Sequence, residues 1–171
     1  MSKSKIRRRL KNQKGFTLME LMVVVLILGI ISAYAIPTYL SSIRTAKLGQ
    51  VIANYGAART ETWSAYYAPG SDEESAAKAA GQNLTSLTNP FGASSATRQP
   101  VVITDDGGTT YEYWTGSAWA SYDGDGTGSV NLGGGEVVLN YETSGEITVA
   151  AYDDSSTPAS MESETITDPR L

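Results

Sequence analysis

Residues 16–36 read FTLMELMVVVLILGIISAYAI, and this stretch decides the fold. It is apolar almost throughout and carries a single charge, Glu20. A helix of this length spans roughly 30 Å at about 1.5 Å per residue, which matches the hydrocarbon core of a bilayer. The sequence therefore predicts a membrane-spanning helix over residues 16–37. Because Pro37 lacks a backbone donor, we expect a kink or a local loosening of the helix near Ile36.

Residues 1–15 precede the apolar stretch and are strongly basic. They hold seven of the thirteen Lys and Arg residues and no Asp or Glu, whereas the rest of the chain has six basic side chains against eighteen acidic ones. A basic segment directly before an apolar span favours retention on the cytoplasmic side of a membrane. It makes a nucleic-acid patch the less favoured interpretation, so we expect no direct binding of nucleic acid.

The pattern after Pro37 becomes that of an amphipathic helix. Its apolar side collects Leu40, Ile43, Val51, Tyr55 and Ala58, with Leu48 at the edge. This spacing predicts that residues 38–68 continue the first helix until Pro69-Gly70 stops it. Residues 69–99 read as a polar connecting region, in which 71–81 form either a short surface helix or a loop.

Residues 100–152 have the alternation and the turn signals of short strands. Val101–Thr104 is a short apolar run, and two hairpins are expected, Thr109–Trp114 with Trp119–Tyr122 and Glu136–Tyr141 with Glu146–Tyr152. We expect an antiparallel sheet of about four strands, packed against the amphipathic half of the helix. Residues 153–171 are acidic and rich in Ser and Thr, and they predict a flexible C-terminal tail. The expected fold class is α+β.

The composition excludes several kinds of chemistry. The chain has no Cys and no His, so it forms no disulfide, no Cys/His zinc site, no thiol nucleophile and no histidine base. It also lacks a nucleophile elbow and a phosphate loop. A membrane-anchored enzyme that uses paired carboxylates remains the alternative class, and it is disfavoured because the strand region is too small for a typical cleft. We therefore expect a protein that is not an enzyme.

The junction Lys14-Gly15-Phe16-Thr17-Leu18-Met19-Glu20-Leu21, followed by the apolar run and Pro37, resembles the N-terminal signature of type IV pilins and pseudopilins. The resemblance covers residues 1 to about 60. It implies that a prepilin peptidase cuts after Gly15 and that the new terminal residue, Phe16, is N-methylated. It also implies that Glu20 neutralises the terminal amine of a neighbouring subunit and that Pro37 lies where the helix bends or melts in filaments.

The function implied by this resemblance is that of a structural subunit of a type IV pilus. The implied partners are identical or related pilin subunits, the prepilin peptidase and an inner-membrane assembly platform. The precursor would be a single-pass protein of the cytoplasmic membrane, and the assembled subunit would lie in an extracellular pilus. The alternative is a pseudopilin of a type II secretion or DNA-uptake system, in a filament that spans the periplasm. Adhesion and twitching motility are among the roles that the family performs.

Two features of the C-terminal half leave alternatives open. Asp123 and Asp125 lie in a glycine-rich loop that reads either as a flexible acidic loop or, more weakly, as a calcium site; no other cofactor is expected. The first hairpin carries five aromatic residues, and we expect them on one face, as packing against neighbouring strands or as a sugar- or surface-binding patch. They are Tyr111, Tyr113, Trp114, Trp119 and Tyr122.

Overall fold

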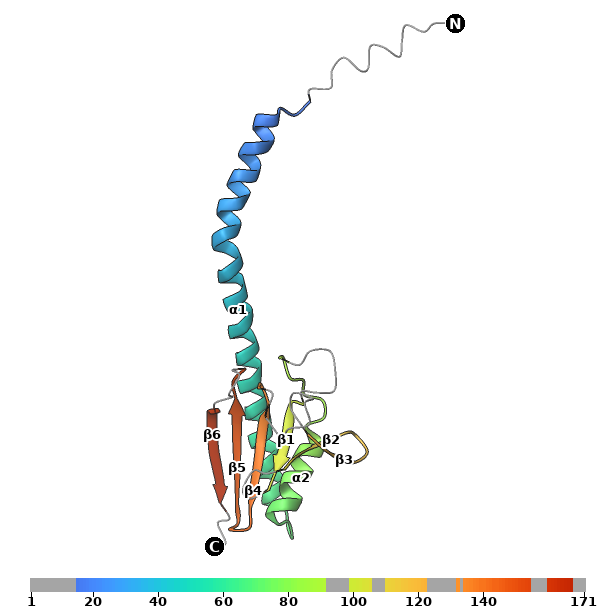
Figure 1. Cartoon of the computed structure of the whole chain (residues 1–171). Coiled ribbons are helices and arrows are strands. Elements are labelled where there is room, and N and C mark those ends of the chain that lie inside the picture. Colours follow the sequence, from blue (N-terminus) through green and yellow to red (C-terminus); the bar gives the residue numbers. More distant parts are fainter. Residues whose placement is uncertain are drawn as a thin grey trace, which may run out of the picture. The chain divides into compact units, whose positions relative to one another are not determined.

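The computed structural model describes residues 15–91, 99–105, 110–122, 132, 134–154 and 160–167. Its elements are α1 (Leu18–Tyr66), α2 (Glu73–Asn83), β1 (Val101–Thr104), β2 (Tyr111–Trp114), β3 (Trp119–Ser121), β4 (Val137–Glu142), β5 (Glu146–Tyr152) and β6 (Ser160–Thr167). Two compact units divide the chain between Ile43 and Arg44. The first unit contains the apolar part of α1, and the second contains the rest of α1 with α2 and the sheet; the expected α+β class is confirmed (Figure 1).

α1 runs from Leu18 to Tyr66 and includes Pro37. The expected continuation of the helix beyond Pro37 is thus confirmed. In the second unit, α1 buries one side chain per turn towards the sheet, at Val51, Asn54, Ala58, Thr62 and Tyr66. Spacings of three and four residues place these side chains on one face of a helix, which is the amphipathic pattern expected from the sequence.

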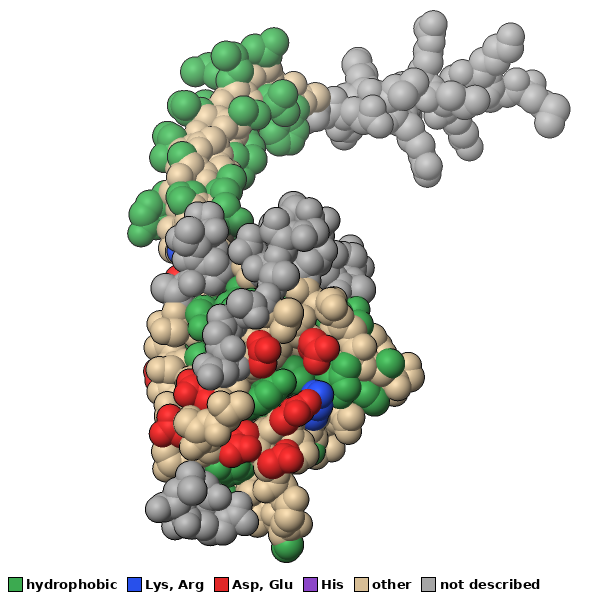
Figure 2. Space-filling view, turned by 60° about the horizontal axis from the view of Figure 1, so that its bottom comes forward, with side chains coloured by type: hydrophobic (Ala, Val, Ile, Leu, Met, Phe, Trp, Pro, Cys, Tyr) green, Lys and Arg blue, Asp and Glu red, His purple; other side chains and the backbone are tan. Residues whose placement is uncertain are grey.

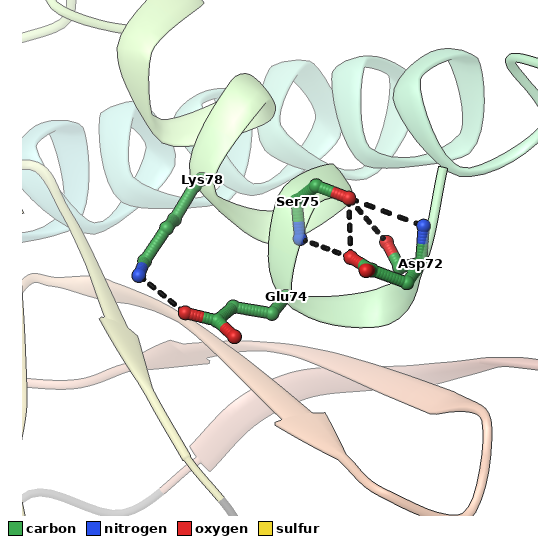
Figure 3. A network of polar contacts seen from close by, with 4 residues as sticks. All are labelled: Asp72, Glu74, Ser75 and Lys78. Atoms are coloured by element: carbon green, nitrogen blue, oxygen red, sulfur yellow. Dashed lines mark hydrogen bonds and ion pairs between the residues drawn. The ribbon is translucent and has the colours of Figure 1, made fainter. Parts of the chain in front are cut away.

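α2 forms in the region that the sequence left open between helix and loop. Asp72 caps it: its carboxylate accepts a hydrogen bond from the Ser75 amide at 2.8 Å, and the Ser75 hydroxyl accepts one from the Asp72 amide at 3.1 Å (Figure 3). This reciprocal capping box satisfies amides that the first turn of a helix leaves unpaired. Glu74 in the first turn forms an ion pair at 2.5 Å with Lys78, which lies one turn later in α2.

The sheet has six strands in the order β3-β2-β1-β4-β5-β6. Both expected hairpins form, but the expectation of an all-antiparallel sheet of about four strands was wrong. β1 pairs with β4 in parallel, from Val101 opposite Val137 to Thr104 opposite Asn140. Parallel neighbours need a long connection, and here the β2–β3 hairpin lies within it. The sheet is therefore mixed.

The two faces of the sheet carry different clusters. α1 and α2 cover one face, and its core includes Ile103, Leu139 and Ile147. The other face carries a smaller cluster around Val102, Val138 and Tyr122. Side chains alternate along a strand, so the aromatic residues of the first hairpin divide between the two faces. Trp119 packs with the helices whereas Tyr111, Tyr113 and Tyr122 pack on the far side, and the expectation of a single aromatic face was wrong.

β6 forms within the stretch that the sequence predicted as a flexible tail. It pairs with β5, and the ladder runs from Thr167 opposite Glu146 to Ser160 opposite Tyr152. Ile166 of β6 is fully buried opposite Ile147. That part of the prediction was wrong: β6 is held by its pairing with β5 and by the burial of Ile166, and the polar composition of the stretch signals neither. The other parts of residues 153–171 that are not described, 155–159 and 168–171, stay outside this correction.

Two ion pairs join α1 to the C-terminal part of the chain. Arg44 donates to both carboxylate oxygens of Asp154, at 2.8 to 3.2 Å, and Arg59 pairs with Glu164 on β6. Lys47 is half-buried, and its ammonium lies 5.3 Å from the centre of the Phe91 ring. All these contacts lie within the second unit.

Candidate processing and assembly site

The candidate site is the start of α1, where a second capping box forms. Thr17 precedes the first helical residue, and its hydroxyl accepts a hydrogen bond from the Glu20 amide at 3.2 Å. One Glu20 carboxylate oxygen in turn accepts from the Thr17 amide at 3.0 Å and from the Thr17 hydroxyl at 2.9 Å. Threonine at the cap with glutamate three residues later is the sequence pattern of this arrangement.

This geometry turns the Glu20 carboxylate back towards the N-terminus of α1. The first-turn amides and the helix dipole both favour a negative charge there. Between residues 15 and 43, Glu20 is also the only Asp, Glu, Lys or Arg. A partner of opposite charge for this carboxylate must therefore come from another part of the chain, from a new terminus or from another molecule.

Gly15 and Phe16 lie immediately before this cap and outside the helix. Both are exposed, and the side-chain position of Gly15 would meet nothing within 4 Å. An exposed, non-helical segment is the kind of backbone that a peptidase cleft admits in extended form. Glycine suits such a cleft because it carries no side chain.

The first unit exposes its apolar side chains all around α1. Large hydrophobic residues from Phe16 to Leu40 have exposed fractions between 46% and 79%, and Figure 2 shows them in green around the helix. α1 contains a segment long and apolar enough to cross a membrane, by length and composition, and none of that segment is buried. An apolar helix without a protein core around it needs lipid or the apolar surface of other molecules.

Pro37 lies inside α1 and does not end it. Side-chain hydroxyls bond to carbonyls in the turns beside it: Thr38 donates to Tyr34 at 2.9 Å, and Ser41 and Ser42 donate to Thr38 at 2.8 and 2.9 Å. Such back-bonding is common where a helix bends or loses a main-chain bond. The helix therefore continues past the position at which we expected a kink.

The remaining site predictions fall in other parts of the chain. Asp123 and Asp125 lie outside the described residues, so calcium binding stays a prediction. Within the residues that are described, no group of three or more His, Cys, Asp or Glu could hold a metal ion. Sequence reasoning missed the capping role of Thr17, although the Thr-x-x-Glu pattern was the signal for it.

Comparison with known proteins finds matches to the N-terminal region of the chain. The family model of the prokaryotic N-terminal methylation motif matches residues 10–36. The type IV major fimbrial protein FimA of Dichelobacter nodosus is 50% identical over 48 residues, 28% of this chain and 31% of that protein. The type IV major alpha-pilin of Moraxella bovis is 38% identical over 77 residues, 43% of this chain and 48% of that protein.

A fimbrial protein of Pseudomonas aeruginosa is 43% identical over 56 residues, 33% of this chain and 36% of that protein. No solved structure matches the chain. The matches thus span between about a third and a half of the relatives' length. The start of α1 is that of a protein with an N-terminal methylation motif. Over this N-terminal region the chain is similar to type IV pilins and fimbrial proteins.

Proposed function

We propose that the chain is a structural subunit of a type IV pilus. It is inserted in the cytoplasmic membrane as a precursor, cleaved after Gly15 by a prepilin peptidase, and N-methylated at Phe16. The observation that carries the proposal is the unburied apolar helix, which begins directly after an exposed Gly15-Phe16 bond and holds a lone carboxylate in its first turn. In this role residues 1–15 are a removable leader and residues 16–37 serve first as membrane anchor and then as filament core.

Cleavage creates the charge that Glu20 lacks. The new amine stands on Phe16, next to the Thr17 cap. In apolar surroundings an isolated charge of either sign is costly, and pairing offsets part of that cost. The Glu20 of one subunit and the terminal amine of its neighbour therefore fix the axial shift between two packed helices, because any other shift leaves both charges unpaired.

Packing of the helices follows from their composition. Gly29, Ser32, Ala33 and Ala35 are small and allow close approach of helix backbones in an apolar medium. A single head-to-tail contact repeated between identical subunits generates an open helical fibre. The proposed partners are thus further pilin subunits, the peptidase and an inner-membrane assembly platform, and the assembled protein lies outside the cell.

A structural role agrees with the relatives, whose names are those of fimbrial and pilin proteins. The alternative within the family is a pseudopilin of a type II secretion or DNA-uptake machine, with the same N-terminal chemistry. The two differ in filament length: a pilus extends from the cell, and a pseudopilus ends within the envelope.

The test is the N-terminal residue and its mass in a fraction sheared from cells that make the protein. We expect a chain that starts at Phe16, carries one extra methyl group and is found in visible filaments. A chain that keeps its leader and stays in the membrane would overturn the proposal. A processed, methylated chain in filaments too short to shear would support the pseudopilin alternative.

A further inference from the structure

The second unit contains a pocket that the pilus function does not use. It lies between the end of α2 and the strands β1 and β2, and it has a volume of about 370 Å³. That volume is at the lower end of the range for small-molecule sites in proteins. Its lining includes Leu84 and Thr85 after α2, Gln99 and Val101 at β1, and Trp114 and Thr115 at the end of β2.

The pocket exists because two neighbouring strands separate. β1 and β2 pair at Ile103–Glu112 and Thr104–Tyr111, and the ladder stops there. If the register of Ile103 and Glu112 continued by two residues, Val101 would pair with Trp114. Both of these residues line the pocket instead. The pocket is therefore a wedge that is closed at one end by the two strand pairs.

Backbone groups from β2 face into this wedge. The Thr115 amide donates to the Ala118 carbonyl at 2.9 Å across the β2–β3 turn. In an antiparallel ladder, hydrogen-bonded and non-bonded pairs alternate, so the adjacent pair, Trp114 with Trp119, is of the non-bonded kind. The amide and carbonyl of Trp114 consequently point away from β3, towards β1.

Backbone groups from β1 face into the wedge from the opposite side. The Val137 amide donates to the Pro100 carbonyl at 2.9 Å, which directs Pro100 towards β4. Alternation then directs the amide and carbonyl of Val101 towards β2. Two main-chain donors and two acceptors thus face the pocket, in addition to the exposed Thr85 hydroxyl.

An aromatic wall completes the pocket. The Trp114 ring packs against the Trp119 ring, with centroids 5.5 Å apart. Trp119 in turn lies over Gly81 of α2, where an added methyl group would approach its ring to 2.8 Å. Glycine at this position is what lets the indole pair sit close to the helix. The Trp114 ring is half-buried and is held from behind by these contacts.

The residues that line the pocket indicate which chemical class of ligand it would bind. Among the residues that the structure describes, no Asp, Glu, Lys or Arg lines the pocket, so these residues offer a charged ligand no counter-charge for its lost hydration. A wholly apolar ligand would leave the strand-edge donors and acceptors without partners. A neutral molecule with hydroxyl groups around a small apolar face satisfies both conditions.

We propose that this pocket binds a neutral sugar ring, as a free monosaccharide or as the terminal residue of a glycan. The apolar face of the ring lies on Trp114, and its hydroxyls bond to the edges of the two strands and to Thr85. A continuous peptide strand does not fit the wedge, because the Ile103–Glu112 pair closes its inner end.

The test uses the full-length chain in a zwitterionic detergent, since detergents with sugar head groups would compete for the pocket. Saturation-transfer NMR is recorded with a panel of neutral methyl glycosides at millimolar concentration, with methyl glucuronide as the charged comparison. We expect transfer to at least one neutral glycoside and little to the glucuronide. Thr85→Ala should weaken its affinity about 3- to 10-fold, the equivalent of one hydrogen bond.

Ser86→Ala is the matched control, because it removes a hydroxyl from the next residue, which does not line the pocket. It should leave binding unchanged, and Trp114→Ala should abolish it. Loss of the Trp114 ring also removes packing against Trp119, so the comparison of Thr85→Ala with Ser86→Ala is the decisive test. Absence of transfer to every glycoside, or equal effects of the Thr85 and Ser86 changes, would overturn the proposal. Binding of a short extended peptide in place of sugars would overturn it as well. Filament formation is not involved in any of these outcomes.

Discussion

Ile166→Ala tests directly whether the C-terminal strand belongs to the folded head. Ile166 is fully buried in the edge strand β6, opposite Ile147 of β5, and packs in the cluster under the helices. Replacing a buried isoleucine by alanine costs about 2–5 kcal/mol, and an edge strand can relax around the cavity. We therefore expect a loss of about 2–3 kcal/mol in the free energy of unfolding.

Such a loss is measurable with the chain's own tryptophans. Trp63, Trp114 and Trp119 are the three in the sequence, and all lie in the second unit, so tryptophan fluorescence of the full-length protein in detergent reports on that unit alone. At roughly 3–5 °C per kcal/mol for a domain of this size, the melting temperature should fall by about 6–15 °C.

Ser163→Ala in the same strand is the matched control, since Ser163 is exposed and faces Ala150 across the ladder. A surface change of this kind stays within about 0.5 kcal/mol. If Ile166→Ala melted within about 2 °C of the parent, β6 would not be packed in solution. The flexible tail that the sequence suggested would then be the better description.

Three further predictions concern single charges and the processing site. Glu20→Ala should insert in the membrane and be processed, yet should form few filaments, because the terminal amine of a neighbour loses its partner; abundant filaments by electron microscopy would contradict the charge pair. Gly15→Leu should leave the uncut precursor in the membrane, and mature protein detected by mass spectrometry would contradict cleavage after this residue. Hydrogen bonds from Arg44, and its charge, hold the pKa of Asp154 below its ordinary value of about 4. The contribution of this pair to stability is therefore present above that value and is lost as the pH falls through the lowered pKa. Asp154→Asn should melt slightly below the parent at pH 7 and together with it near pH 2, and a difference that persists in acid would refute this cause.

The strongest periodic patterns in the sequence predicted the structure well. The apolar run and the spacing of Val51 and Ala58 placed α1 correctly, because burial on one face fixes a 3.6-residue period. The turns Thr115–Ala118 and Glu142–Gly145 placed the two hairpins. At the start of α1, Glu20 attracted notice because a charge within an apolar run is costly.

The features that sequence reasoning missed depend on contacts between distant residues. The parallel pairing of β1 with β4 joins residues 36 positions apart, such as Val101 and Val137, and no local turn signal encodes it. The sequence did not decide between a helix and a loop for α2, because the capping box of this helix uses Ser75 where the usual pattern has Glu or Gln. Its buried face is built from alanines and a glycine, which carry a weak hydrophobic signal.

β6 shows how this chain holds its C-terminal region without a disulfide. The sequence contains no cysteine, so no disulfide can hold this region. A disulfide contributes about 2–4 kcal/mol, mainly by restricting the unfolded chain. Burial of Ile166 supplies a contribution of similar size, and the ladder to β5 and the Arg59–Glu164 pair add to it. These contacts stabilise the folded state instead, so the region should respond to core substitutions in β6 and be indifferent to reducing agents.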